Sequence, residues 1–144
     1  MLFDITADVE QGAFGLFGDP PSVELAGVQI ARSVDSQVET VDVVLTFGGI
    51  HDRLLGHIVA RELDARTSLI VTPLEGTLEL LGSVNPGEHV LVFGCWLEDV
   101  NVVAATAKMI RSRGGHEVVA SLVPATGSYL GSLNCEWIAI AGTR

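Results

Sequence analysis

Short runs of mainly apolar residues, without polar alternation, constrain the fold of this chain more than any other feature. Four of them cover residues 41–47, 68–71, 90–93 and 118–123, and a fifth lies at 137–141. A strand inside a parallel sheet is buried on both faces, so it stays apolar along its length. These runs therefore predict the strands of a parallel sheet.

Helical patterns separate the predicted strands. Apolar residues recur at three- and four-residue intervals over 23–34, 55–63 and 100–110, which is the spacing of one helix face. Gly114-Gly115 follows the last of these segments and is suited to ending a helix in the left-handed conformation. Strands and helices in this order favour an α/β domain with a Rossmann-like parallel sheet flanked by helices.

The long connection at 72–88 contains the turn signal Asn85-Pro86-Gly87 and has room for a short hairpin. In parallel sheets of this type, ligands lie beyond the carboxyl ends of the strands. We therefore expect the functional residues in the loops that follow Phe47 and Phe93.

The length and composition favour one folded domain. The chain has 144 residues, of which 48% are apolar, and disordered tails are poor in such residues. We expect a single domain over 1–144, in which the segment 1–20 forms an N-terminal cap or an interface. Cys95 and Cys135 lie far apart and lack the spacing of a metal site, so no zinc site is expected. No cofactor is expected either.

Acidic residues dominate the charge. There are 8 Lys+Arg against 18 Asp+Glu, which gives a formal net charge of −10, and an acidic surface repels the phosphate backbone of nucleic acids. No apolar run reaches the roughly 18 residues of a membrane span, and the N-terminus lacks the cationic region of a secretion signal. The expected protein is soluble and cytoplasmic and binds neither nucleic acid nor membranes.

The loop after the first predicted strand contains Gly48-Gly49, followed by His51 and Asp52. Glycines at a strand end let the backbone expose its N–H groups, as in anion-binding loops, although a plain strand-to-helix turn is the alternative. Asp52 is expected to cap the next helix. A helix N-terminus disfavours the imidazolium, so a neutral His51 is a candidate base, with a partly solvated loop histidine as the alternative.

Several segments resemble the type I phosphoribosyltransferases, and most closely the orotate phosphoribosyltransferases. In chain order they are QGAFGLFGDP, the GGI turn, a helix ending in ARELDA, the turn NPGEHVLVFG and a helix ending in RSRGGHEVV. The resemblance covers residues 12–123. It implies a type I phosphoribosyltransferase-like fold, a small-molecule ligand and a homodimer.

The motif for phosphoribosyl pyrophosphate is degenerate in this chain. The resemblance implies two adjacent acids for the ribose hydroxyls and then a Thr/Gly-rich turn for the 5′-phosphate. Gly94-Cys95 takes the place of the acids, and Glu98 and Asp99 lie in the place of the turn. Like charges about 4 Å apart repel by about 1 kcal/mol in water and about 4 kcal/mol at an effective dielectric constant of 20, which disfavours phosphate binding. Ordinary helix capping is the alternative role for these acids.

The residues of the predicted site are assigned two kinds of role. Acid–base chemistry is assigned to His51, Glu98 and Asp99, and ligand binding to Gly48, Gly49, Arg53, Cys95, Trp96 and Asn101. Core packing is the alternative for Trp96, and Cys95 at a strand end is also a candidate for a modestly activated thiol.

Three functions remain open on these residues. The first is a divergent phosphoribosyltransferase-like protein that has lost phosphoribosyl transfer and uses the old pocket for acid–base chemistry of the lyase, cyclase, isomerase or hydrolase type. The second is a non-catalytic binding or regulatory dimer. The third is an active orotate-type phosphoribosyltransferase, which the reversed charge of the motif disfavours.

Overall fold

The apolar runs form the centre of one sheet. We describe the fold from a computed structural model, which describes residues 19–71, 77–95, 100–121 and 137–139. Within these residues six strands form a sheet of order β3-β2-β1-β4-β5-β6. In chain order the strands are β1 (Val43–Thr46), β2 (Arg66–Val71), β3 (Glu79–Leu81), β4 (His89–Gly94), β5 (His116–Ser121) and β6 (Trp137–Ala139).

The predicted parallel pairing is confirmed, and the sheet contains one further strand that the apolar runs do not predict. Neighbouring strands from β2 through β1, β4 and β5 to β6 are all parallel. The added strand, β3, is antiparallel to β2, with Leu81 opposite Leu69, and lies in the long connection for which a short hairpin was expected. β3 is the edge strand of the sheet, and none of its three residues is fully buried.

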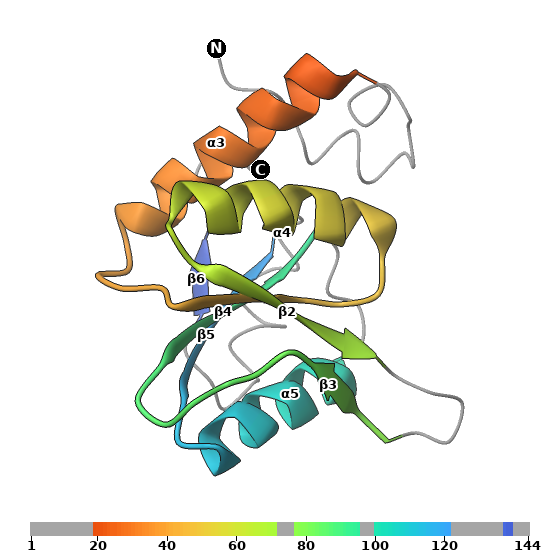
Figure 1. Ribbon diagram of the computed structural model, residues 1–144, viewed down its shortest axis with the longest axis vertical. Helices are drawn as coiled ribbons and strands as arrows, with labels where there is room; N and C mark the ends of the chain where they lie inside the picture. Colours follow the sequence, from red (N-terminus) through yellow and green to blue (C-terminus); the bar gives the residue numbers. More distant parts are fainter. Residues whose placement is uncertain (1–18, 72–76, 96–99, 122–136, 140–144) are drawn as a thin grey trace.

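Three helices cover the two faces of the sheet in the described part of the chain. They are α3 (Pro20–Asp35), α4 (Ile50–Glu62) and α5 (Val100–Ser112). Figure 1 shows α3 and α4 on one side of the sheet and α5 on the other. Successive strand residues point to opposite faces. Accordingly Val44 packs with α3 and α4, whereas Val43 and Leu45 pack in the cluster that includes the α5 residues.

The structure tests two predicted helix ends, the C-terminal end of α5 and the N-terminal end of α4. Gly114 has a φ of +81° just beyond α5, which confirms the left-handed end expected from the sequence. The expectation that Asp52 caps α4 is wrong: Gly49 is the N-cap, the helix begins at Ile50, and Asp52 is its third residue. The extended backbone of Gly49 starts the helix one turn earlier than the apolar pattern indicates, and this leaves the Asp52 carboxylate available for a partner outside its own helix.

Candidate functional site

The site lies where the direction of the strand order changes. The chain passes from β1 to β2 on one side and returns to β4 on the other side of β1, so β1 and β4 are neighbours with Thr46 opposite Phe93. The loop with Gly48 and Gly49 leaves β1 at this edge, and Cys95 follows β4 there. Such a reversal is where open α/β sheets bind ligands.

A carboxylate joins the two loops at this edge. The backbone N–H of Cys95 donates a hydrogen bond of 2.7 Å to Oδ1 of Asp52, which is 43 residues earlier in the chain. The other oxygen, Oδ2, lies 3.6 Å from the point where a Cβ on Gly49 would stand. The Asp52 side chain therefore occupies the space between the glycine loop, the first turn of α4 and the end of β4.

Burial raises the pKa of Asp52 above its ordinary value of 3.8. The Cys95 N–H and the charge of the neighbouring His51 act in the opposite direction and offset part of this effect on the pKa. Asp52 is thus a partly desolvated carboxyl group beside a histidine. This combination is typical of groups that exchange protons in a site.

Cys95 is not the activated thiol that was considered from the sequence. It is 3% exposed, and burial raises the pKa of its thiol, with the Asp52 carboxylate adding to the rise. A thiol of this kind stays protonated near neutral pH and is a poor nucleophile. The contribution of Cys95 to the edge is its backbone N–H.

The glycine pair leaves open space at the edge. Both glycines are exposed, and a Cβ on Gly48 would meet no atom of the described surroundings within 4 Å. Neither residue is among the glycines of positive φ in the described ranges. Backbone conformation and packing against the described residues therefore do not require glycine at position 48.

The remaining predicted site residues divide into two groups. His51 is half-buried in the first turn of α4, next to Asp52, and Asn101 is exposed in the first turn of α5. Trp96, Glu98 and Asp99 lie outside the described residues.

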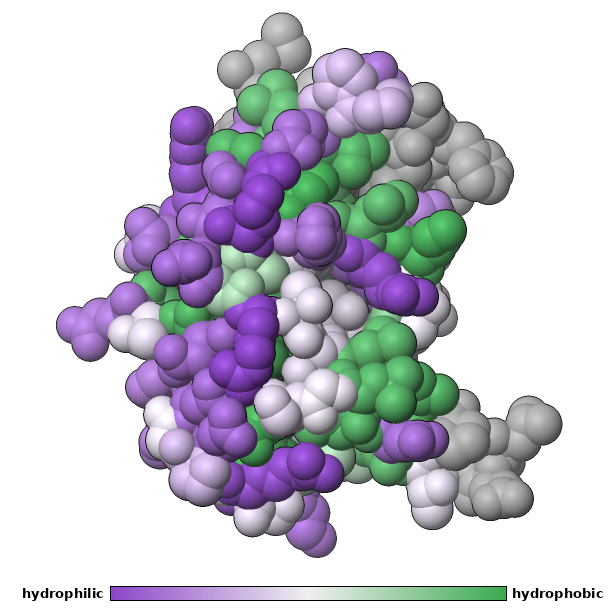
Figure 2. Space-filling model, in the orientation of Figure 1, coloured by the Kyte–Doolittle hydropathy of each residue, from purple (hydrophilic) through white to green (hydrophobic). Residues whose placement is uncertain are grey.

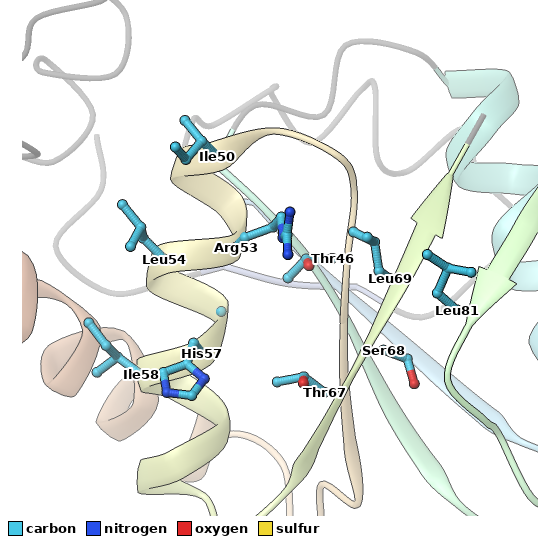
Figure 3. Close-up of a pocket in the computed structure, with 11 residues that line it drawn as sticks. Thr46, Ile50, Arg53, Leu54, His57, Ile58, Thr67, Ser68, Leu69 and Leu81 are labelled. Carbon is cyan, nitrogen blue, oxygen red and sulfur yellow. The ribbon is translucent and has the colours of Figure 1, made fainter. Parts of the chain in front are cut away.

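A hollow of about 510 Å³ lies beside this edge, between α4 and strands β1 to β3. Figure 3 shows Arg53 extending from α4 toward Thr46, with His57 one turn further along the helix. Of the predicted site residues that the structure describes, Arg53 lines this hollow, whereas Gly48, Gly49, His51, Cys95 and Asn101 do not. Arg53 therefore belongs to a different surface from the glycine loop that it follows.

Sequence reasoning missed the site role of Asp52. Its type and position pointed to helix capping, and its contact with Cys95 depends on the pairing of β1 with β4, which no local pattern encodes. Among the described residues, no group of three or more His, Cys, Asp or Glu side chains is arranged to hold a metal ion. In the same residues no helix has the length and apolar character needed to cross a membrane.

The chain is similar to known proteins in structure but matches none of them by sequence. No protein-family model matches it, and no curated protein matches it by sequence. Solved structures do match. A crystal structure of adenine phosphoribosyltransferase aligns with a TM-score of 0.72 and 10% identity over 87% of this chain and 83% of that one. Adenine phosphoribosyltransferase from Saccharomyces cerevisiae, complexed with an imino-altritol bisphosphate and adenine, gives 0.70 and 11% over 87% and 82%.

Orotate phosphoribosyltransferase from Aeropyrum pernix aligns with a TM-score of 0.67 and 15% identity, over 87% of this chain and 73% of that one. The chain has the type I phosphoribosyltransferase fold. The predicted resemblance and the predicted α/β class are therefore confirmed at the level of the fold. In this fold the Asp52–Cys95 contact lies at the carboxyl edge of β1 and β4, beside the glycine loop.

Proposed function

We propose that this phosphoribosyltransferase-like protein no longer transfers phosphoribosyl groups and uses the carboxyl edge of its sheet for another small molecule. The observation that carries the proposal is the 2.7 Å hydrogen bond from the Cys95 N–H to the Asp52 carboxylate. A backbone N–H at the end of a strand, beside a helix N-terminus, is a group that binds anions. Here an acid of the chain itself takes that N–H.

The charge of the neighbouring segment supports the same proposal. Glu98 and Asp99 stand in the sequence where the resemblance implies a phosphate-binding turn. Together with Asp52 they bring negative charge to the segments that follow β1 and β4. A phosphate dianion meets repulsion from each of these acids, whereas a neutral or cationic ligand does not.

The proposed chemistry is acid–base. Asp52 and His51 are consecutive in the first turn of α4, and a carboxyl whose pKa is raised by burial, beside an imidazole, is a pair of groups that can accept and donate protons. Glu98 and Asp99 are the further candidates in this proposal. A lyase, cyclase, isomerase or hydrolase reaction needs no more than such groups and a positioned substrate.

Calorimetry with phosphoribosyl pyrophosphate and Mg²⁺ tests the loss of phosphoribosyl transfer. We expect no saturable heat for this chain, with adenine phosphoribosyltransferase from Saccharomyces cerevisiae measured in parallel as the comparison protein. Saturable binding by this chain at micromolar concentration would overturn the proposal. It would support an active orotate-type transferase, which orotate and the same donor would then test directly.

A non-catalytic binding or regulatory homodimer is the second candidate function. It is favoured by the position of the 510 Å³ hollow, which lies along α4 and not between the glycine loop and Cys95. A thermal-shift screen against neutral and cationic small molecules separates the two candidates. Ligands that raise the melting temperature of the native chain but not of His51→Ala and Asp52→Asn support a site at the edge. Shifts that survive both substitutions contradict it.

The proposed setting of this function is the cytoplasm, with two copies of the chain acting together. The homodimer is implied by the resemblance, and the acidic composition fits a protein that does not bind nucleic acid. Sedimentation of the purified chain measures the number of copies directly.

A further inference from the structure

Two histidines lie side by side at the amino edge of the sheet, the edge opposite the proposed site. His89 begins β4 and His116 begins β5, and the two residues are direct partners in the parallel register of these strands. Their imidazole rings have centroids 5.1 Å apart and planes inclined by 28°. The helix α5 separates them in the sequence, so only the pairing of β4 with β5 brings them together.

Strand alternation places both histidines on the face of the sheet that α3 and α4 cover. Leu91 of β4 and Ala120 of β5 pack in the core cluster of that face, and each lies an even number of residues beyond its histidine. Both histidines are exposed, because they precede the buried part of their strands. Figure 2 shows mainly hydrophilic side chains along the left side of the molecule, where the turns that lead into β4 and β5 lie in Figure 1. The pair is therefore accessible to ions in solution.

The charges beside the pair favour a cation. Asp42, just before β1, exchanges two hydrogen bonds with the backbone of His89: its N–H donates to the His89 carbonyl oxygen, and its Oδ2 accepts the His89 N–H, both at 2.8 Å. Two arginines also lie at this edge, but Arg66 and Arg111 each form an ion pair with a glutamate. A cation at the rings is therefore attracted by the Asp42 carboxylate, while the charge of each arginine is balanced by its partner.

The separation of the rings fits a single metal ion. Two imidazoles that bind one ion through bonds of about 2.0–2.1 Å have centroids about 4.5 Å apart at a right angle and about 5.2 Å apart at the tetrahedral angle. The observed 5.1 Å lies within this range. The torsion about each Cβ–Cγ bond is soft, and its axis passes close to the ring centroid. Rotation can therefore direct one nitrogen of each ring to a common point without changing the separation.

We propose that His89 and His116 form a two-histidine site for a divalent transition-metal ion of the class that imidazole prefers, which is Zn²⁺, Ni²⁺ and Cu²⁺. No third His, Cys, Asp or Glu among the described residues completes the site, so water molecules fill the remaining positions. The ion links the starts of β4 and β5 and stabilises the folded chain, because the unfolded chain does not hold the two imidazoles together. The site lies at the other edge of the sheet from Asp52, so it stands or falls independently of the proposed function.

Calorimetric titration of the full chain with Ni²⁺ tests the site, in a buffer above neutral pH because a metal ion binds the neutral imidazole. We expect one saturable event with a dissociation constant between about 1 and about 100 µM. Excess Mg²⁺ is expected not to compete, because it prefers oxygen ligands. His89→Ala and His116→Ala are each expected to raise the dissociation constant at least about tenfold. The matched control is His57→Ala, which removes an exposed histidine of α4 and is expected to leave the affinity unchanged.

Thermal unfolding separates an ion site from ring stacking, which needs no ion. Ni²⁺ is expected to raise the melting temperature of the native chain and of His57→Ala, but not of His89→Ala or His116→Ala. The bonds between Asp42 and His89 use the backbone of His89, so the alanine variant keeps them and is expected to fold. His116→Ala provides the same readout should His89→Ala misfold.

Three results would overturn the proposal. The first is the absence of saturable heat with Ni²⁺ in the native chain. The second is an unchanged affinity, or an equal rise in melting temperature, in His89→Ala and His116→Ala. The third is displacement of Ni²⁺ by Mg²⁺, which would assign the binding to carboxylates of the acidic surface.

Discussion

Asp52 illustrates how one residue can connect parts of the chain that are distant in sequence. Its carboxylate accepts the N–H of Cys95 across 43 residues, and this contact ties the first turn of α4 to the end of β4. The hydrogen bond satisfies a backbone group next to a fully buried strand end, where an unpaired N–H is costly. Burial of the carboxyl raises the pKa of Asp52 and the Cys95 N–H offsets part of that rise, so this contact affects both stability and chemistry.

The two roles of Asp52 can be separated by substitution. Asp52→Ala removes the acceptor and leaves the Cys95 N–H unpaired, so we expect a loss of about 1–3 kcal/mol in the free energy of unfolding. Asp52→Asn keeps an oxygen acceptor, and its loss is expected to be smaller. Urea unfolding at neutral pH measures both values. An Asn variant as unstable as the Ala variant would show that the hydrogen bond is not the source of the effect.

The pH dependence of the Asn variant follows from the sign of the pKa shift. The folded-state pKa of Asp52 is above its value of 3.8 in the unfolded chain, so the stability that the protonated carboxyl contributes is present below 3.8 and is lost as the pH rises through the folded-state pKa. The stability of Asp52→Asn relative to the native chain is therefore expected to increase across that window. Thermal unfolding from acid to neutral pH checks the direction, and a constant difference would contradict it.

At the scale of elements, α4 is held close to both α3 and β1 by glycines. A Cβ on Gly27 of α3 would stand 2.4 Å from Cγ2 and 2.7 Å from Cβ of Ile58 on α4. A Cβ on Gly56 of α4 would stand 2.4 Å from Cγ2 of Thr46 on β1. This close packing fixes the height of α4 above the sheet, and with it the position of Asp52 at the edge.

Alanine substitutions distinguish a packing glycine from a site glycine. Gly27→Ala is expected to cost about 1–3 kcal/mol through overpacking against Ile58, more than the roughly 1 kcal/mol that alanine gains in helix propensity. Gly48→Ala meets open space and is expected to leave stability unchanged or raised by up to about 1 kcal/mol. Urea unfolding compares the two variants. A Gly48→Ala variant as destabilised as Gly27→Ala would refute this division.

The elements themselves were largely predictable from local pattern. Every described strand except β3 overlaps an apolar run, because a strand buried on both faces is apolar throughout. The apolar pattern does not predict β3, because Glu79 interrupts the apolar character of this strand. Its pairing partner, β2, is also determined only by the tertiary structure. The apolar pattern also predicts a start of α4 that is too late, because the first turn of the helix is exposed at Ile50 and contains no buried apolar residue.

At the scale of the whole molecule, the two ends of the sheet serve different purposes. The amino ends of the strands carry the connection through Asn85 and Gly87, and there Arg66 of β2 donates a hydrogen bond of 2.6 Å to Glu88 in the turn before β4. The same arginine donates to the Ser83 carbonyl oxygen. The Arg66–Glu88 ion pair therefore lies at the end of the sheet away from the proposed site, where it contributes to the fold without occupying the ligand edge.

The Arg66–Glu88 pair makes part of the stability of the whole chain dependent on acid pH. The hydrogen bond from Arg66 lowers the pKa of Glu88 from 4.5 to about 2. Its contribution is therefore fully present above pH 4.5 and is lost as the pH falls toward about 2. We expect the difference in melting temperature between the native chain and Glu88→Gln to shrink over that range. Arg66→Met is the matched partner variant, and a difference that does not vary with pH would contradict the assignment.

The sequence alone determined the α/β class, the positions of the strands that pair in parallel and the acidic character of the chain, because burial and charge are properties of short segments. Only the tertiary structure decided that Asp52 meets Cys95, that the Cys95 thiol is buried and unreactive, and that Arg53 lines a hollow between α4 and the strands. Each of these depends on which strands become neighbours. That choice follows from packing of the whole chain and leaves no signal in any one segment.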